Sequence, residues 1–346
     1  MNMLWEKTRD SIGILDQEAM NKAKERLDFL LKPQGSLGRL EDLATQLSGI
    51  YGEYPPSQRE KAIVMMTADN GVYAEGYHSY PQEITRVIAE VAGPGLTGVS
   101  VLARQAGAKV VVVDVGIKDE VKGEHIIRRK VKYGTANIAK GPAMSRQEAI
   151  QAIEAGIEVT NVLCTAGIGV IGLGEAGICN TTTSAAVLSS LLGLEPEEVV
   201  GQGAGADEVA YQAKVRVVKE ALSVNKPNSE DPLDVLAKVG GLDIAGLVGC
   251  CLAGAANRVP VVVDGFIAGT AALIACRLNP QVRDFLIPSH FSAEKGTQLL
   301  FAALELEPML YMNMRLGEGS GAALAFNLID SARLIITEMG TFADLE

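Results

Sequence analysis

An α/β fold, in which helices cover both faces of a parallel sheet, is the fold class that this 346-residue sequence predicts. Two observations support it. Five short, continuously apolar runs alternate with longer segments that carry apolar residues at helical spacing. Hydrophobic residues make up 48% of the chain and aromatic residues only 5%, with 37 glycines, so the interior must consist mainly of closely packed aliphatic side chains.

The chain is expected to begin with helices and to continue as alternating strands and helices. Residues 12–31 and 40–51 have helical periodicity, which the segment 32–38 interrupts, and Pro55 and Pro56 within 52–57 mark the boundary to the sheet. Strands are predicted at 62–67, 109–113, 167–173, 259–263 and 285–288. Helices are predicted at 83–92, 98–106, 146–164, 181–193, 207–222, 242–256, 266–277, 293–304 and from 322 onward.

A polar residue follows each predicted strand, in most cases close to a glycine. These residues are Asp69, Asp114, Glu175, Asp264 and His290. Because ligands of open parallel sheets bind at the carboxyl ends of the strands, we expect these side chains to line one rim together with Glu318. The alternative for each residue taken alone is a turn or capping role.

Glu318 is the strongest candidate for a catalytic base. It stands between Gly317 and Gly319 directly before an apolar stretch, so it is expected where a loop turns into a helix. The positive end of that helix would favour the ionised carboxylate, and the Ser320 hydroxyl is a candidate cap for the helix. The alternative is that Glu318 is only a capping carboxylate of the first turn.

Two glycine-rich segments are candidates for holding a phosphate group. Residues 172–184 run from a predicted strand into a helix and offer backbone N–H groups with Asn180, Thr181, Thr182 and Thr183 as neutral donors. The second segment, 201–207, precedes a helix that carries Lys214, which would reach back to the same phosphate. The alternative for Lys214 is a solvated surface lysine.

The spacing Gly172-x-Gly174-x-x-Gly177 also matches a dinucleotide-binding fingerprint. The acidic residue that would bind a ribose about twenty positions later is missing from the right place. A P-loop motif is absent as well. A NAD-dependent oxidoreductase and a non-catalytic nucleotide-binding protein therefore stay open as alternative functions.

Composition and charge exclude several classes of partner. The net charge of −11 without a Lys/Arg-rich run argues against nucleic-acid binding. The charged N-terminus is unlike a signal peptide, and the most apolar windows are too short or are interrupted by Asp264, so we expect a cytoplasmic protein without a membrane span. Three distant histidines and five cysteines without C-x-x-C spacing predict neither a metal site nor a cofactor.

The polar loop 75–82 carries two tyrosines, Tyr77 and Tyr80. Such a loop can wall a flat heteroaromatic ligand with its rings. The alternative is an exposed surface loop without a ligand.

Six motifs, which occur in order along the chain, together resemble the nicotinate-nucleotide:dimethylbenzimidazole phosphoribosyltransferase family. The motifs are Lys32-Pro-Gln-Gly-Ser-Leu-Gly-Arg-Leu40, Asp69-Asn-Gly-Val72, Gly174-Glu-Ala-Gly-Ile-Cys-Asn-Thr-Thr182, Asp264-Gly-Phe266, Pro288-Ser-His-Phe-Ser-Ala-Glu-Lys295 and Arg315-Leu-Gly-Glu-Gly-Ser-Gly-Ala322.

This resemblance implies transfer of a 5-phosphoribosyl group from nicotinate mononucleotide to 5,6-dimethylbenzimidazole, giving α-ribazole 5′-phosphate and nicotinate. It also implies a homodimer, a Rossmann-like large domain at 59–318, and a small helical domain assembled from residues 1–58 and 319–346.

The resemblance carries roles to individual positions. Glu318 matches the general base. The ribose and phosphate region matches Glu175, Gly177, Asn180, Thr181, Thr182, Gly203 and Lys214. The two bases are expected near Ser79, Gln82, Asp264, Ser289, His290, Met314 and Leu316. The sequence departs from the family pattern at Asn70, Ala176 and Cys179, which leaves the base selectivity open.

Overall fold

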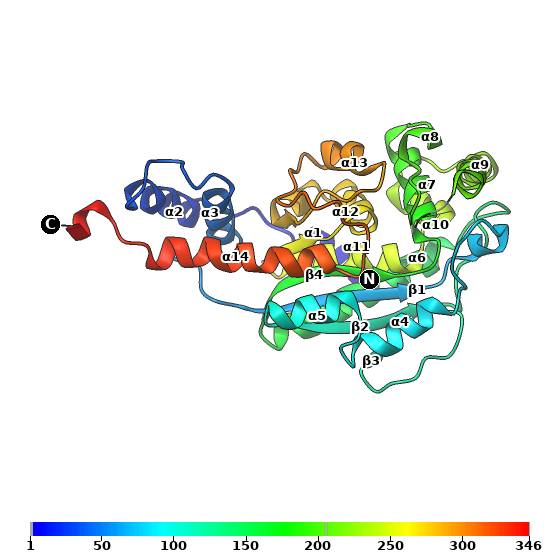
Figure 1. Ribbon diagram of the computed structural model, residues 1–346, viewed down its shortest axis with the longest axis horizontal. Coiled ribbons are helices and arrows are strands. Elements are labelled where there is room, and N and C mark those ends of the chain that lie inside the picture. The colour runs from blue at the N-terminus through cyan, green and yellow to red at the C-terminus, as the bar shows by residue number, and fades with distance from the viewer. Residues whose placement is uncertain (1–2, 204, 206, 346) are drawn as a thin grey trace.

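The computed structural model describes residues 3–203, 205 and 207–345, and these residues form a six-stranded parallel sheet at the centre of the molecule (Figure 1). Its strands are β1 (Glu60–Ala68), β2 (Ala108–Gly116), β3 (Ile126–Arg128), β4 (Ile168–Ala176), β5 (Val261–Val263) and β6 (Leu286–Pro288). The spatial order is β3-β2-β1-β4-β5-β6, and every neighbouring pair is parallel. In this Rossmann-like order a ligand crevice is expected where the order reverses, between β1 and β4. The predicted fold class is confirmed.

Alternate residues of β1 show how the sheet is covered on both faces. Ile63 and Met65 belong to the core with α4 (Ile84–Ala92), α5 (Gly98–Gln105) and α14 (Ser320–Glu338). Val64 and Met66 belong to the opposite core, with α6 (Arg146–Thr165) and α11 (Leu242–Ala256). Because successive strand residues point to opposite faces, a strand that is covered on both sides is apolar throughout. This explains why its apolar run predicted the strand.

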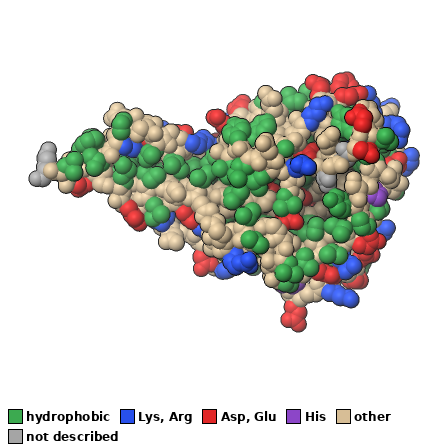
Figure 2. All heavy atoms as spheres, viewed as in Figure 1, with side chains coloured by type: hydrophobic (Ala, Val, Ile, Leu, Met, Phe, Trp, Pro, Cys, Tyr) green, Lys and Arg blue, Asp and Glu red, His purple; other side chains and the backbone are tan. Residues whose placement is uncertain are grey.

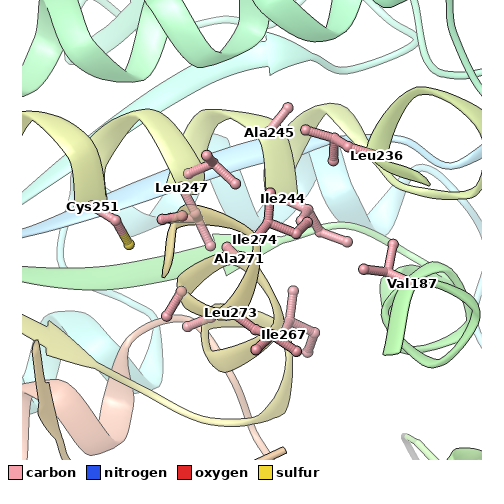
Figure 3. Close-up of a cluster of buried hydrophobic side chains, with 14 of the residues drawn as sticks. Val187, Leu236, Ile244, Ala245, Leu247, Cys251, Ile267, Ala271, Leu273 and Ile274 are labelled. Carbon is pink, nitrogen blue, oxygen red and sulfur yellow. The ribbon is translucent and has the colours of Figure 1, made fainter. Parts of the chain in front are cut away.

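A second layer of helices packs on α11 and positions the loops after β4 and β5. Figure 3 shows Ile244 and Leu247 of α11 among Ile274 of α12 (Phe266–Leu278), Val187 of α7 (Asn180–Leu192) and Leu236 of α10 (Pro232–Val239). These side chains belong to one buried cluster. The N-termini of α7 and α12, which follow β4 and β5 respectively, are therefore held at the same edge of the sheet.

The helices near the two chain ends extend away from the sheet. α2 (Gln17–Phe29), α3 (Arg39–Tyr51) and the far half of α14 form a projecting part in Figure 1. The Leu31 N–H donates to the Gly340 carbonyl at 2.8 Å and ties the two termini together. α1 (Leu4–Asp10) packs instead against α6 and α11. The division into domains at residues 58 and 318 stays a prediction.

Several element boundaries differ from the predicted ones. The helix predicted at 12–31 begins only at Gln17, because the Asp16 side chain accepts the Ala19 N–H and caps it there. The helix predicted at 293–304 is α13 (Thr297–Leu304), and that predicted at 207–222 is α9 (Glu208–Asn225). The sequence reasoning gave no bounds for α1, which lies in the part of the chain expected to be helical. It missed β3, α8 (Pro196–Val199), α10 and three 3₁₀ helices, Gly71–Glu75, Pro280–Phe285 and Phe342–Leu345.

No helix among the described residues is long and apolar enough to cross a membrane.

Candidate active site

A cleft of about 640 Å³ opens at the carboxyl ends of β4, β5 and β6. This volume lies within the range of roughly 300–1,000 Å³ that is typical of small-molecule sites. The loop after β1 forms one wall, and the turn before α14 forms another. Twelve residues predicted for the site line it: Ser79, Glu175, Gly177, Asn180, Thr181, Thr182, Gly203, Lys214, Asp264, His290, Leu316 and Glu318.

Three predicted base-binding residues do not line this cleft. The Gln82 side chain accepts a long hydrogen bond from Lys118 Nζ at 3.5 Å. Ser289 is fully buried and its hydroxyl donates to the Asp264 carbonyl, while the Met314 carbonyl accepts the Ala293 N–H. Each is separated by only a few residues from one that does line the cleft, so sequence proximity was a poor guide to side-chain direction.

Asp69 and Asp114, which were expected on the same rim, also lie outside the cleft lining. The Asp69 carboxylate accepts the Lys118 N–H, and the Asp114 carboxylate accepts the Ile117 N–H and pairs with Lys130. These contacts close the turns after β1 and β2. The turn role is therefore the one that the structure gives to both residues.

Lys214 and the start of α7 form the cationic part of the cleft. Lys214, which is only 3% exposed, donates from Nζ to Thr181 Oγ1 at 2.8 Å and to the Gly201 carbonyl at 3.0 Å. Burial lowers its pKa below the ordinary lysine value. A Cβ on Gly203 would lie 3.1 Å from Thr181 Oγ1 and 3.4 Å from Lys214 Nζ, so Gly203 borders the same group. Lys214 is thus not a solvated surface lysine.

The first two glycines that match the dinucleotide fingerprint do not form a ligand-binding loop. Gly172 and Gly174 lie inside β4 instead of in a loop after it. A Cβ on Gly174 would stand 2.3 Å from the Glu318 carbonyl oxygen. These glycines allow close packing of α14 on the strand. The part of the segment from Gly177 to Thr182 lines the cleft, and its role in holding a phosphate stays a prediction. Ala204 and Ala206 of the second glycine-rich segment lie outside the described residues.

Glu175 and Asp243 form a buried pair of carboxyl groups, of which the sequence predicted only Glu175 as a site residue. Asn180 Nδ2 donates to Glu175 Oε2 and, at 3.2 Å, to Asp243 Oδ2. Burial, followed by the charge of Asp243, raises the pKa of Glu175 to about 8, and burial raises the pKa of Asp243 to about 6. Asp243 was missed because it lies in the first turn of the long apolar helix α11, where an acidic residue normally signals only capping.

Glu318 is held in the cleft by a strained turn and by a different helix than predicted. Its backbone has φ = 64°, and the residue is 8% exposed. Its Oε2 accepts the Val99 N–H at 3.2 Å, at the N-terminus of α5. Burial raises the pKa of Glu318, and the N–H groups of Val99 and Gly98 oppose that rise. The expectation that α14 keeps this carboxylate ionised is therefore corrected.

The predicted cap of α14 is also corrected. Ser320 is the first helical residue, and its hydroxyl donates to the Gly317 carbonyl at 2.8 Å. The N–H groups at the start of α14 are accepted by Asp264 instead. Sequence reasoning could not find this partner because it lies more than fifty positions earlier in the chain.

Aromatic and charged residues complete the cleft. Tyr77 and Tyr80 line it, as the loop 75–82 predicted, and the Tyr77 hydroxyl donates to Thr182 Oγ1 at 2.8 Å.

Arg315 and Glu294 also line the cleft and were missed as site residues, although both lie within motifs that carry the family resemblance. Glu294 Oε2 is buried without a hydrogen-bond partner among the described residues. Burial lowers the pKa of His290 to about 4, so its ring is neutral near pH 7.

The described residues contain no group of three or more His, Cys, Asp or Glu side chains placed to hold a metal ion. The cleft instead joins a buried lysine and neutral hydroxyl donors with a buried carboxylate. This combination suits an anionic ligand and a proton transfer.

Comparison with known proteins decides the family. A family model described as a phosphoribosyltransferase matches residues 12–346. A nicotinate-nucleotide–dimethylbenzimidazole phosphoribosyltransferase of Ruminiclostridium cellulolyticum is 52% identical over 342 residues, covering 99% of this chain and 97% of that protein. This chain belongs to the nicotinate-nucleotide–dimethylbenzimidazole phosphoribosyltransferase family. A member from Alkaliphilus metalliredigens is 51% identical and covers 99% of both chains.

A solved structure of this phosphoribosyltransferase family has the same fold. The crystal structure of CobT from Thermus thermophilus superposes with a TM-score of 0.91 at 39% identity, covering 95% of this chain and 98% of that one. Among the six family motifs, the one at 32–40 lies between α2 and α3 in the projecting part. Lys32 and Glu41 form a largely buried ion pair there at 2.8 Å.

Proposed function

We propose that this enzyme transfers the 5-phosphoribosyl group of nicotinate mononucleotide to 5,6-dimethylbenzimidazole, giving α-ribazole 5′-phosphate and nicotinate. The observation that carries the proposal is that one cleft holds both Lys214 beside hydroxyl donors and the buried carboxylate of Glu318. Family membership supplies the two substrates, since the name of the enzyme family states them.

Glu318 serves as the general base in this proposal. The departing nicotinate is a pyridinium in the nucleotide and therefore leaves without help from an acid. The benzimidazole must lose its ring N–H proton while its other nitrogen attacks the anomeric carbon, and one ionised carboxylate suffices for this. Burial raises the pKa of Glu318 toward the working pH, which makes it a better proton acceptor.

The displacement inverts the anomeric carbon from β to α. This requires that the acceptor and the nicotinate lie on opposite sides of a fixed ribose. Positioning of two reactants supplies several kcal/mol of the rate enhancement in such reactions, roughly 7–11 at its limit. Hydrogen bonds hold Lys214 and the Glu318 carboxylate in defined positions in the cleft, so the two residues can orient the donor and the acceptor.

The phosphate of the nucleotide binds to Lys214, Thr181 and Thr182 in this proposal. Replacing Lys214 with alanine should raise KM for nicotinate mononucleotide about tenfold or more, because a charge-assisted hydrogen bond contributes ~1.5–3 kcal/mol. Steady-state kinetics measure this effect. Lys219→Ala is the matched control, since Lys219 is on the same helix and its salt bridge with Glu197 is half-exposed. An unchanged KM for Lys214→Ala would reject the phosphate role.

Arg315 is the cation available for the carboxylate of the nicotinate ring. Lys214 and Arg315 are the only lysine and arginine among the described residues that line the cleft, and Lys214 is assigned to the phosphate. Arg315→Gln should therefore lower kcat/KM for nicotinate mononucleotide about tenfold and leave kcat/KM for nicotinamide mononucleotide, which lacks the carboxylate, within about twofold. A parallel loss with both nucleotides would contradict this role, because it would mean that Arg315 does not read the carboxylate.

The overall activity is tested by following nicotinate by chromatography. Nicotinate should form from nicotinate mononucleotide only when dimethylbenzimidazole is present. Binding of the nucleotide without nicotinate release would favour the non-catalytic alternative. An absorbance change with NAD(H) and a reducible substrate would favour the oxidoreductase alternative.

A homodimer and a cytoplasmic location are further parts of the proposal. Figure 2 shows hydrophobic atoms gathered on the surface of the projecting part and beside it. The large apolar side chains that are exposed include Leu96, Val101, Tyr311, Leu316, Phe29 and Phe342. Exposed apolar areas of this kind commonly mark an interface. Light scattering should give twice the 36.5 kDa of one chain. A single-chain mass at micromolar concentration would contradict the dimer.

A further inference from the structure

The carboxylate of Asp264 accepts hydrogen bonds from backbone N–H groups at the start of α14. Its Oδ2 accepts the Gly319 N–H at 3.1 Å, and its Oδ1 accepts the N–H groups of Gly321 at 2.7 Å and Ala322 at 3.2 Å. Asp264 is 2% exposed. The first N–H groups of a helix have no partner within the helix, so a carboxylate here satisfies three of them at once.

The turn that Asp264 holds is conformationally unfavourable at one of its residues, Glu318. Glu318 has φ = 64° and Gly319 has φ = 93°, so both occupy the left-handed region. That region is unfavourable for a residue with a Cβ, and such a conformation persists only where the surroundings enforce it. Gly319, at the N-cap position, has no side chain to cap the helix. The conformation of Glu318 therefore depends on contacts from elsewhere in the chain.

Asp264 is itself fixed from the neighbouring strand. The Ser289 hydroxyl, at the end of β6, donates to the Asp264 carbonyl at 2.9 Å, and His290 Nδ1 lies 3.6 Å from Asp264 Oδ1. A Cβ on Gly321 would come within 1.9 Å of His290 Nδ1. The ends of β5 and β6 and the first turn of α14 are thus locked into one another without spare space.

We propose that Asp264 is a positioning residue for the general base: it fixes the turn 317–321 so that the Glu318 carboxylate stays on the Val99 N–H and faces the acceptor. This inference rests on the proposed function. It replaces the expectation that Asp264 binds one of the two bases, because three N–H groups of the protein already occupy its carboxylate oxygens.

Asp264→Asn tests the role by its kinetic signature. An amide keeps one acceptor oxygen but turns an N–H₂ group toward a backbone N–H, so the turn loosens. A shift of about 1 Å in a reacting group can lower a rate about 100-fold, so kcat should fall ~10–100-fold. KM for nicotinate mononucleotide should stay within about twofold, because the phosphate group is bound elsewhere in the cleft.

A double-mutant cycle with Glu318→Gln separates positioning from other roles. If Asp264 acts through Glu318, Asp264→Asn should lower the residual rate of the Glu318→Gln enzyme by no more than about twofold. The residual rate is measured with enzyme in excess over nucleotide, so that slow single turnovers are visible. An equal fold-loss in both backgrounds would overturn the inference, since it would show that Asp264 acts without Glu318.

The proposed function is tested by a measurement that does not depend on the Asp264 variant. Nicotinate release by the unaltered enzyme is measured first, and its absence would overturn the function and this inference together. If Asp264→Asn does not fold, Ser289→Ala takes its place in the cycle, because it removes the hydroxyl that contacts the Asp264 carbonyl and His290 Nδ1 and leaves the Asp264 carboxylate in place. The expected result is a smaller kcat loss, again absent in the Glu318→Gln background, and a loss that persists there would contradict the role.

Discussion

Replacing Glu318 with glutamine should lower kcat by ~100-fold or more while nicotinate mononucleotide binds as before. The loss of a general base is commonly of this size. Glutamine has nearly the same shape, and its amide oxygen can still accept the Val99 N–H, so the turn and the cleft should persist. What is lost is the ability to take the proton of the acceptor. Steady-state kinetics and calorimetric nucleotide binding measure the two quantities.

Glu338→Gln is the matched control for this experiment. Glu338 is the last residue of the same helix, α14, and is exposed. It should retain the turnover of the unaltered enzyme. A Glu318→Gln enzyme whose kcat stays within about threefold of normal would rule out Glu318 as the base.

The second large effect is expected at Gly174, within β4. Gly174→Ala should lower kcat ~100-fold, because its Cβ would stand 2.3 Å from the Glu318 carbonyl oxygen and 2.9 Å from the carbonyl carbon. Backbone atoms cannot yield as a flexible side chain does, so the turn that carries the base must shift. The free energy of unfolding should also fall, by ~1–3 kcal/mol, which is the usual range for overpacking. Kinetics and urea unfolding measure the two effects.

Gly169→Ala, in the same strand, provides the control for Gly174→Ala. Its Cβ would meet the Cβ and Cγ atoms of Arg59 at 2.7 Å, and none of its three nearest atoms belongs to the turn that carries Glu318. It should therefore destabilise the protein modestly and leave kcat unchanged. If the two variants lost stability and activity in the same proportion, the specific contact between Gly174 and the Glu318 turn would not explain the result.

The sheet was predictable because strands that are buried on both faces consist of continuous apolar residues, which are easily seen in the sequence. Continuous apolar runs identified β1, β2, β4, β5 and β6, and each predicted strand overlaps the observed one. β3 has only three residues, ends in Arg128 and lies at the sheet edge, so it leaves no such record. The start of α2 was wrong because apolar spacing continued into residues 12–15 ahead of the Asp16 cap.

The candidate site was predictable where local spacing carries the chemistry. Glu318 between two glycines and the polar start of α7 were found from the sequence and line the cleft. The contacts that tune these groups join residues far apart in the chain. Asp243 reaches Asn180 from 63 positions away, and Asp264 reaches Gly321 from 57 positions away. No periodicity or local motif records such contacts, so sequence reasoning missed Asp243 and did not find the contact of Asp264 with the start of α14.

In the proposed reaction Glu318 deprotonates the acceptor, and a single displacement inverts the configuration of the anomeric carbon while the ribose is held in place. The most direct test is the anomeric configuration of the ribosyl product that the unaltered enzyme forms from nicotinate mononucleotide and dimethylbenzimidazole, assigned by nuclear magnetic resonance. We predict the α-anomer, formed in an amount equal to the nicotinate released. A β-anomer would contradict the claim, because retention requires two successive displacements.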